Sequence, residues 1–183
     1  FGKSGTFGKS GTFGKSGTFG KSKHLVNNLN MSNLDGAYWN ERYLQHNTGW
    51  DIGYPSTPIK AYIDQLKEKS VSILIPGCGN GYEAIYLLEQ GFPNITLIDI
   101  APILTESLQK KLPKEKFPHL KILTGDFFEL EGQFDLIIEQ TFFCALDPAL
   151  RDSYALKMKS LLKPGGRVAG VLFNRDFEGG PPF

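Results

Sequence analysis

From Val71 onward, short apolar runs alternate with longer segments whose apolar residues recur at helical spacing. The long segments predict helices, and the short runs predict strands that are buried on both faces. Strand–helix alternation over about 100 residues predicts a mostly parallel sheet with right-handed crossovers and flanking helices, which is an α/β fold. The predicted strands are 71–75, 95–98, 120–123, 134–138 and 168–173, and the predicted helices are 82–90, 103–112 and 148–162.

Two further helices are predicted before the first strand. Asp35 suits the N-cap of a helix that ends near 47–49. Pro58 fits the first turn of a second helix over 59–69, where Ile59, Tyr62, Ile63 and Leu66 follow helical spacing. The loop that joins these helices is punctuated by glycine and proline, which are typical of turns.

The first 22 residues repeat the hexamer Phe-Gly-Lys-Ser-Gly-Thr, which cannot bury an apolar face. We therefore expect a tag-like repeat at 1–22 and a single domain at 23–183. Removing the four lysines of the repeat from the 20 Lys and Arg leaves 16 against 19 Asp and Glu, and the formal charge changes from +1 to −3. A domain of this charge lacks the dense basic surface of nucleic-acid-binding proteins, so we expect no nucleic-acid partner.

The Gly-Lys-Ser units of the repeat do not form a P-loop, because Lys3 and Lys9 stand where that loop needs a glycine. The remaining signals favour a cytoplasmic protein. Cys78 and Cys144 are the two cysteines, and no stretch approaches the roughly 18 apolar residues of a membrane span, so we expect no membrane partner. The three histidines are assigned no catalytic role, and no metal site is expected.

Three glycines at alternate positions, Gly77, Gly79 and Gly81, follow the first predicted strand. They lie at the carboxyl edge of the predicted sheet, where open α/β sheets bind ligands. A dinucleotide site has the pattern Gly-x-Gly-x-x-Gly, but Tyr82 stands where the third glycine belongs. Gly-x-Gly-x-Gly is instead typical of S-adenosylmethionine enzymes with a Rossmann-like fold. The alternative is a tight turn that is glycine-rich by chance.

Acidic residues follow the next two strands. Asp99 closes the second strand about 20 residues after the glycines, a position suited to accepting hydrogen bonds from two ribose hydroxyls. Asp126 and Phe127 follow the third strand, where they suit an adenine amino group and an adenine ring. The alternatives are a helix-capping Asp99 and a loop Asp126 beside core phenylalanines.

The fourth strand runs into Glu139-Gln-Thr-Phe-Phe-Cys-Ala. Residues at this place are expected to face the methyl donor and the acceptor, which makes Glu139, Gln140, Phe142 and Phe143 candidates for the acceptor pocket. The two phenylalanines fit an apolar pocket and plain core equally well. Cys144 is interpreted as a packed small hydrophobe, because no histidine lies nearby in sequence to activate its thiol.

Four motifs together resemble the thiopurine S-methyltransferase superfamily, and Phe-Phe-Cys-Ala resembles its thiol and halide methyltransferase branch. The resemblance runs from about Leu34 to Phe183, and 34–58 resembles the family's N-terminal cap. It implies that Trp39, Tyr43, Trp50 and Gln140 contact the cofactor, with the aromatic rings beside the sulfonium. The motifs are Pro76-Gly-Cys-Gly-Asn-Gly81, Gly125-Asp-Phe-Phe128, Thr141-Phe-Phe-Cys-Ala-Leu146 and Leu161-Leu-Lys-Pro-Gly-Gly166.

This chain departs from the family pattern in three respects. Trp is usual in the family at the position of Tyr43. Relatives carry Tyr where this chain has Gln140, which puts an acceptor-side contact there in question. The family fold also continues with two further strands after the position of Phe183, so the predicted sheet lacks its last two strands and the C-terminus is truncated. A sheet without them exposes its last strand as an edge.

The expected function is methyl transfer from S-adenosylmethionine to a small soft nucleophile (a thiol, sulfide, thiocyanate or halide), with S-adenosylhomocysteine as product. In-line displacement needs alignment and exclusion of water more than a titrating group, so no catalytic residue is assigned. A related enzyme acting on oxygen or nitrogen remains open, and a clear general base in the pocket would favour it. A non-catalytic cofactor-binding relative and a nicotinamide oxidoreductase also remain open, although the glycine spacing disfavours the oxidoreductase. The sequence does not define an oligomeric state.

Overall fold

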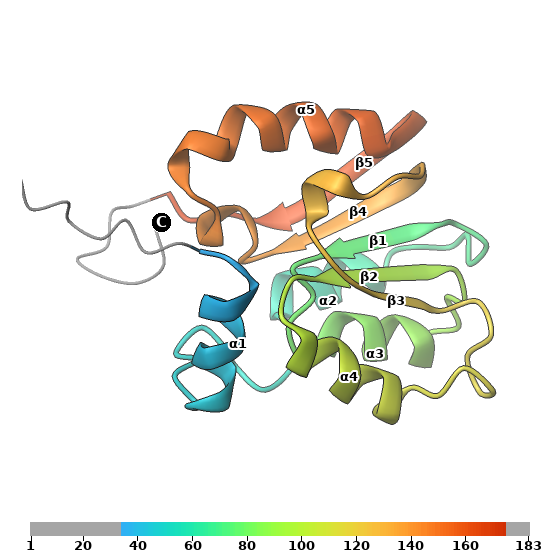
Figure 1. Cartoon of the computed structure of the whole chain (residues 1–183). Helices are drawn as coiled ribbons and strands as arrows, with labels where there is room; N and C mark the ends of the chain where they lie inside the picture. Colours follow the sequence, from blue (N-terminus) through green and yellow to red (C-terminus); the bar gives the residue numbers. More distant parts are fainter. Residues whose placement is uncertain (1–33, 175–183) are drawn as a thin grey trace, which may run out of the picture. The chain divides into compact units, whose positions relative to one another are not determined.

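The computed structural model describes residues 34–174. A single five-stranded sheet in the order β3-β2-β1-β4-β5 forms its centre, and every pair of neighbouring strands is parallel (Figure 1). The predicted α/β architecture is therefore confirmed. The strands are β1 (Ile73–Pro76), β2 (Ile95–Asp99), β3 (Lys121–Thr124), β4 (Phe134–Gln140) and β5 (Leu162–Val171).

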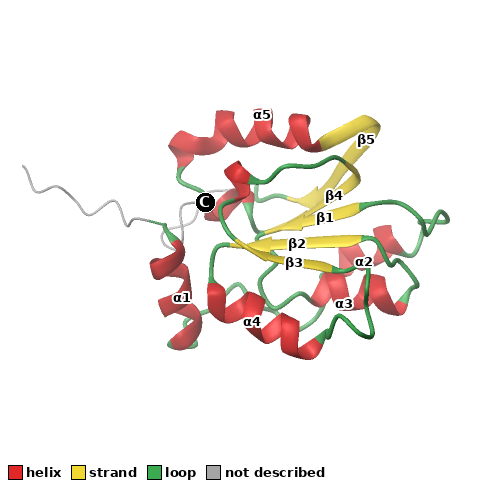
Figure 2. Ribbon diagram, turned by 45° about the vertical axis from the view of Figure 1, so that its right-hand side comes forward, coloured by secondary structure: helices red, strands yellow, loops and turns green. Residues whose placement is uncertain are grey.

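Helices lie on both faces of this sheet, and α5 lies on the face opposite to α3 and α4 (Figure 2). The first helix, α1, lies beyond the carboxyl ends of the strands (Figure 1). Two contacts hold it there: the N–H of Ile103 donates to Asn40 Oδ1 at 3.0 Å, and a Cβ on Gly36 would lie 2.8 Å from the carbonyl oxygen of Ile100. The helices are α1 (Gly36–Leu44), α2 (Thr57–Ile63), α3 (Tyr82–Glu89), α4 (Pro102–Lys111) and α5 (Arg151–Leu161).

The alternation of side chains along the strands divides the core into two clusters. On β4, Leu136 and Ile138 face the cluster under α2, α3 and α4, whereas Ile137 faces the cluster under α5. The same alternation directs the two polar residues at the end of β4 to opposite faces. Glu139 therefore shares the α5 face with Ile137, and Gln140 shares the face of Ile138.

Every predicted element is present, and four boundaries differ by three residues or more. The first helix, predicted to end near 47–49, ends at Leu44. The helix predicted over 59–69 ends at Ile63, because Gln65 and Leu66 make i→i−3 bonds to the carbonyls of Tyr62 and Ile63 instead of continuing the α-helix. The helix predicted over 148–162 begins with a 3-10 turn at Pro148–Leu150, followed by α5.

The strand predicted over 168–173 starts earlier, at Leu162, although the sequence predicts a turn at Pro164-Gly-Gly166 before it. The pairing of β5 with β4 shifts between Phe134 and Leu136, so that the extra residues form a bulge. A Cβ on Gly166 would lie 2.9 Å from the carbonyl oxygen of Phe134, so glycine allows the two backbones to meet there.

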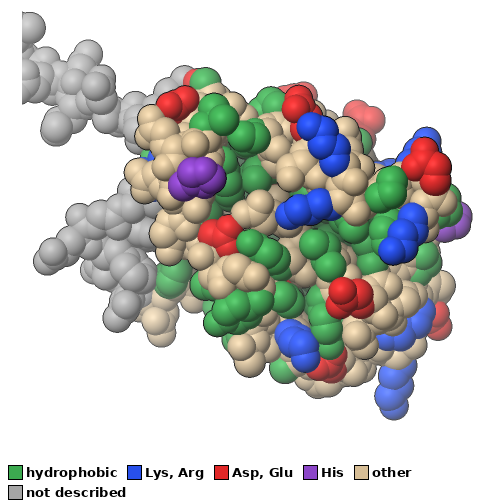
Figure 3. All heavy atoms as spheres, turned by 90° about the horizontal axis from the view of Figure 1, so that it is seen from below, with side chains coloured by type: hydrophobic (Ala, Val, Ile, Leu, Met, Phe, Trp, Pro, Cys, Tyr) green, Lys and Arg blue, Asp and Glu red, His purple; other side chains and the backbone are tan. Residues whose placement is uncertain are grey.

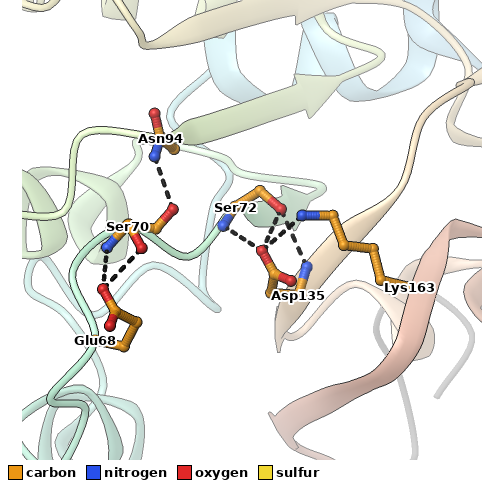
Figure 4. A network of polar contacts seen from close by, with 6 residues as sticks. All are labelled: Glu68, Ser70, Ser72, Asn94, Asp135 and Lys163. Carbon is orange, nitrogen blue, oxygen red and sulfur yellow. Dashed lines mark hydrogen bonds and ion pairs between the residues drawn. The ribbon is translucent and has the colours of Figure 1, made fainter.

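The amino edge of the sheet is held by a polar cluster around Asp135, at the start of β4 (Figure 4). Its Oδ2 accepts from the N–H of Ser72 at 2.8 Å, from the Ser72 hydroxyl at 2.7 Å and from Lys163 Nζ at 2.8 Å. These contacts lower the pKa of Asp135 to about 2, and the hydrogen bond from Lys163 has the largest effect. The cluster ties the loop before β1 to β4 and to the start of β5.

The repeat at 1–22 and the chain end after residue 174, where the truncation is predicted, lie outside the described residues. Within 34–174, no helix is both long and apolar enough to cross a membrane. On the face seen in Figure 3, acidic and basic side chains are interspersed rather than gathered in a patch of one sign. The same part of the chain contains no group of three or more side chains suited to holding a metal ion.

Candidate active site

The glycine loop between β1 and α3 has a left-handed backbone at all three glycines. The φ angles are 57° at Gly77, 52° at Gly79 and 71° at Gly81, a conformation that side chains with a Cβ rarely adopt. The N–H of Gly79 donates to Asp99 Oδ2 at 2.9 Å. The loop therefore turns tightly at the carboxyl end of β1 and presents bare backbone to the space above the sheet.

Asp99 ends β2 beside this loop and is 8% exposed. Its Oδ1 accepts from the N–H of Ala101 at 3.0 Å, while Oδ2 accepts from Gly79. Burial raises the pKa of Asp99, and the bonds from the backbone N–H groups of Ala101, Gly79 and Ile100 act in the opposite direction. Each carboxylate oxygen has a second lone pair, so both can still accept from a pair of hydroxyls.

The predicted aromatic cap is assembled around Trp50. Its ring meets those of Trp39 and Tyr43 edge to face, with centroids 5.6 and 5.9 Å away, and its Nε1 donates to the Tyr43 hydroxyl at 3.2 Å. A Cβ on Gly79 would lie 3.2 Å from that hydroxyl. Burial raises the pKa of Tyr43 well above its usual range. The structure thus brings the three cap aromatics together and places Tyr43 directly over the glycine loop.

A second link between cap and loop is not predicted from the sequence. Asp51 Oδ2 accepts from Asn80 Nδ2, inside the glycine motif, and from the Tyr82 hydroxyl at 3.3 Å. Its Oδ1 accepts from the N–H of Gly53 at 2.8 Å and fixes the turn of the cap loop. The signal that could have found this link is a polar Asn80 between two glycines, where a side chain reaches out of the loop.

Gln140 and Glu139, adjacent at the end of β4, have separate surroundings. Gln140 Oε1 accepts from the Ser56 hydroxyl at 3.0 Å, and the N–H of Ser56 donates to the buried Glu83 at 3.0 Å. Glu139 is 1% exposed, and its Oε1 accepts from the N–H groups of Phe142 and Phe143 at 2.8 and 2.9 Å. Gln140 therefore joins β4 to the cap loop, while Glu139 holds the turn that follows the strand.

This turn brings the predicted acceptor-side aromatics to the cofactor loop. Thr141 has a φ of 60°, which is unusual for a β-branched residue and occurs at functional turns. A Cβ on Gly77 would overlap the ring of Phe142, so this ring lies on the glycine loop. Phe143 lies further out, with its ring centroid 5.0 Å from that of Tyr154. Tyr154, on α5, is a neighbour of the site that sequence reasoning does not identify.

Asp126 and Phe127 occupy the loop after β3. Asp126 is exposed and caps the 3-10 helix Phe127–Glu129, since its Oδ1 accepts from the N–H of Phe128 at 2.8 Å. Phe127 is 4% exposed and packs edge to face on Phe142. Both residues lie on the α5 side of the site, and their contacts with an adenine stay predictions.

Cys144 matches the interpretation as a packed small hydrophobe. It is 8% exposed, and its Sγ donates to the Thr141 carbonyl at 3.2 Å. Burial, followed by the nearby charge of Glu139, raises its pKa to about 11. A thiol held in its protonated form is a poor nucleophile, so Cys144 has the chemistry of a structural residue.

The residues fit an adenosyl cofactor with a sulfonium centre. Bare glycine backbone accommodates close approach, Asp99 offers carboxylate oxygens to a diol, and the electron-rich rings of the cap suit a cation. Asn80, the polar side chain of the loop, is bound to Asp51, and a negative charge at this place disfavours a pyrophosphate. Fold and site together define a Rossmann-like methyltransferase.

The chain belongs to the thiopurine S-methyltransferase family, whose model matches residues 34–183. It is 34% identical over 159 residues to a probable thiol methyltransferase 2 of Arabidopsis thaliana, a match that covers 84% of this chain and 69% of the relative. It is 27% identical to a thiocyanate methyltransferase 1 of Brassica oleracea (79% and 66%) and to a thiopurine S-methyltransferase of Vibrio campbellii (81% and 76%). The chain spans about two thirds of the length of these plant relatives.

Solved structures confirm the fold. A Burkholderia thailandensis 1,6-didemethyltoxoflavin-N1-methyltransferase, solved with S-adenosylhomocysteine, superposes with a TM-score of 0.63 at 22% identity, covering 76% of this chain and 61% of that one. A glycopeptide N-methyltransferase solved with S-adenosylmethionine gives a TM-score of 0.55 at 18% identity, over 64% of this chain and 54% of that one. The family is one of S-adenosylmethionine-dependent methyltransferases.

Proposed function

We propose that this chain transfers the methyl group of S-adenosylmethionine to a small soft nucleophile, foremost a sulfur nucleophile such as a thiol, sulfide or thiocyanate. One observation carries the proposal: the cap residue Tyr43 and the strand-end residue Asp99 meet at the same glycine, Gly79. Sulfur acceptors are favoured because the curated relatives are thiol, thiocyanate and thiopurine methyltransferases. The halides expected from the sequence belong to the same class of soft nucleophiles.

In the proposed complex, Asp99 accepts from the ribose hydroxyls, while Asp126 and Phe127 serve the adenine. Trp39, Tyr43 and Trp50 enclose the sulfonium, with Gln140 beside it. The bound cofactor supplies an activated methyl group, so the protein aligns donor and acceptor and excludes water. Phe142, Phe143 and Glu139 form the acceptor side. The two cysteines, which are buried free thiols, support a reducing compartment, and we propose the cytoplasm.

Turnover of radiolabelled S-adenosylmethionine against thiols, hydrosulfide, thiocyanate and iodide tests this function, and phenols and amines test acceptors with oxygen or nitrogen. We expect methylated sulfur products, and we expect S-adenosylhomocysteine to bind in calorimetry. Binding without turnover of any acceptor would instead support a non-catalytic relative. A preference for phenols or amines would assign the enzyme to the oxygen or nitrogen methyltransferases.

A further inference from the structure

Glu139 is a buried carboxylate that lacks a partner for one of its oxygens. Oε1 accepts from two backbone N–H groups, those of Phe142 and Phe143. Oε2 is fully buried and has no hydrogen-bond partner among residues 34–174. Buried polar atoms almost always have a hydrogen-bond partner in the protein, because burial removes their hydrogen bonds to water and only such a partner replaces them. An unpaired carboxylate oxygen at a candidate active site therefore indicates that a ligand supplies the missing hydrogen-bond donor.

The groups that face Glu139 do not neutralise it. The thiol of Cys144, in the turn after β4, and the phenol of Tyr154, on α5, both have their pKa values raised in part by its charge. Arg151 lies close enough to Cys144 to act on the same thiol in the opposite direction, but its side chain stacks on Phe143, with 5.1 Å from Cζ to the ring centroid.

On the β5 side, the neighbour of Glu139 carries no charge and no side chain. A Cβ on Gly170 would lie 3.1 Å from Oε2, so the missing side chain leaves room for the carboxylate. Burial raises the pKa of Glu139, which makes it a stronger proton acceptor than an exposed carboxylate.

The turn that Glu139 holds reaches the cofactor loop. The N–H of Phe142 is bonded to the carboxylate, and the ring of the same residue lies on Gly77. The reacting sulfur must approach the donor methyl in this neighbourhood if the proposed function holds. Phe142 and Phe143, whose N–H groups bind Oε1, are only partly buried, and Thr141 before them has a left-handed backbone. In the proposal that follows, the acceptor approaches the carboxylate past this turn.

We propose that Glu139 Oε2 accepts the proton of a neutral thiol during methyl transfer, so that the site selects protonated thiols over acceptors that are already anions. The proposal rests on the function proposed above; a general base also serves oxygen and nitrogen acceptors, and the phenols and amines of the turnover panel separate those enzymes from a thiol enzyme. The S–H bond breaks and its proton moves to Oε2, while the sulfur lone pair forms the new bond to the methyl carbon. The bond from that carbon to the sulfonium breaks, and its electron pair stays on the leaving sulfur. The neutral carboxyl later loses its proton to solvent.

Thiocyanate and iodide provide the contrast, because they carry no proton to lose and are repelled by a carboxylate. The experiment compares kcat/KM for an aliphatic thiol and for thiocyanate in wild type and in Glu139→Gln, at saturating S-adenosylmethionine. The amide keeps the shape and the acceptor for both backbone N–H groups. We expect the thiol value to fall about 100-fold or more, the usual contribution of a general base, and the thiocyanate value to stay equal or rise.

Asp135→Asn is the matched control on the same strand, because it removes a carboxylate far from the acceptor side; it should leave the ratio of the two values unchanged. Equal losses for thiol and thiocyanate in Glu139→Gln would overturn the proposal and leave the carboxylate as a support for the turn. Wild type that methylates thiocyanate but no thiol would overturn it as well, while the proposed function would stand. Wild type that methylates none of the acceptors would overturn both.

A second measurement uses wild type alone, in case the variant does not fold. If Glu139 takes the proton, kcat/KM at pH 7 for a series of thiols of differing pKa does not depend on the fraction of each thiol that is ionised. The rising limb of its pH profile then follows the pKa of Glu139, which burial raises, and the falling limb follows the loss of the protonated thiol. A rising limb that moves with the pKa of each thiol would overturn the proposal.

Discussion

The carboxylates at the two ends of β4 differ in their hydrogen bonding and in the direction of their pKa shifts. At the amino edge of the sheet, Asp135 Oδ2 accepts three hydrogen bonds and its pKa is lowered to about 2 (Figure 4). At the carboxyl edge, Glu139 is almost fully buried, its Oε2 has no partner among the described residues, and its pKa is raised. Only the apolar stretch 136–138 separates the two residues, so their difference comes from what each edge supplies.

Along this one strand, Asp135 has the surroundings of a stabilising residue and Glu139 has those of a residue that binds a ligand. A carboxylate with its hydrogen bonds satisfied stabilises the fold, since breaking its contacts costs free energy of unfolding. A carboxylate with an unused oxygen and a raised pKa costs stability and has capacity left for a ligand. At the same edge, the buried Asp99 and the partly buried Tyr43 also have raised pKa values, although both oxygens of Asp99 accept hydrogen bonds.

The largest expected effect is on cofactor affinity at the carboxyl edge. Asp99→Ala removes the acceptor that we propose for two ribose hydroxyls, which would then be buried without partners. It should weaken binding of S-adenosylhomocysteine by about 1–3 kcal/mol, or roughly 5- to 150-fold. Calorimetry measures this, and Asp135→Asn should bind like wild type. Unchanged affinity in a folded Asp99→Ala protein would remove Asp99 from the site.

A substitution in the aromatic cap should have a smaller effect, and it should lower turnover more than stability. Trp50→Ala removes the ring that joins Trp39 to Tyr43 and that stacks on Arg42, with 5.2 Å from Cζ to the ring centroid. In the proposed complex it also removes roughly 0.5–2 kcal/mol of cation–π attraction to the sulfonium. We expect lower turnover with a small loss in melting temperature, and a change in tryptophan fluorescence when S-adenosylhomocysteine is added to wild type. A flat fluorescence signal together with a core-like loss of about 3–5 kcal/mol in stability would show that the cap is static core.

The polar link beneath the cap should contribute less. Asp51→Ala removes the acceptor for Asn80 Nδ2 and the Tyr82 hydroxyl, which tie the cap loop to the glycine loop. We expect cofactor affinity to fall by about 0.5–1.5 kcal/mol, with faster hydrogen exchange in the loop 48–56. Glu68→Ala provides the control, because its hydrogen bonds with Ser70 lie at the opposite edge (Figure 4). Equal exchange in the two variants would count against the link.

The sequence predicts the parts of this site that depend on local geometry. Three alternate glycines after a buried strand require a tight left-handed turn wherever the strand is placed, and Asp35 caps α1 as its position indicates, with Oδ1 accepting from the N–H of Tyr38. Strand–helix alternation restricts the sheet topology in the same way. These features are set by a few neighbouring residues, so they can be recognised in a single chain.

What the sequence does not predict depends on pairing between distant residues. The early start of β5 follows from contact of Gly166 with β4, and the apolar spacing of 168–173 carries no trace of it. The partners of Asp51 and the unpaired oxygen of Glu139 likewise become visible only once the strands and the cap are assembled. Glu139 could be chosen as a site residue from its place in the chain, but its proton chemistry could not.

The smallest expected effect belongs to the amino edge, where it should concern stability alone. Because the pKa of Asp135 is lowered to about 2 from 3.8, its contribution to stability is fully present above about pH 4 and is lost as the pH falls toward 2. The side chain is 36% exposed, so solvent screening limits this contribution to about 1 kcal/mol or less. Asp135→Asn should therefore lower the urea midpoint slightly at pH 7 and by less at pH 2.5, with turnover and cofactor affinity unchanged at pH 7. A gap between wild type and variant that is the same at both pH values would mean that the ion pair with Lys163 is not its source, and a loss of turnover would mean that the two edges of the sheet are coupled.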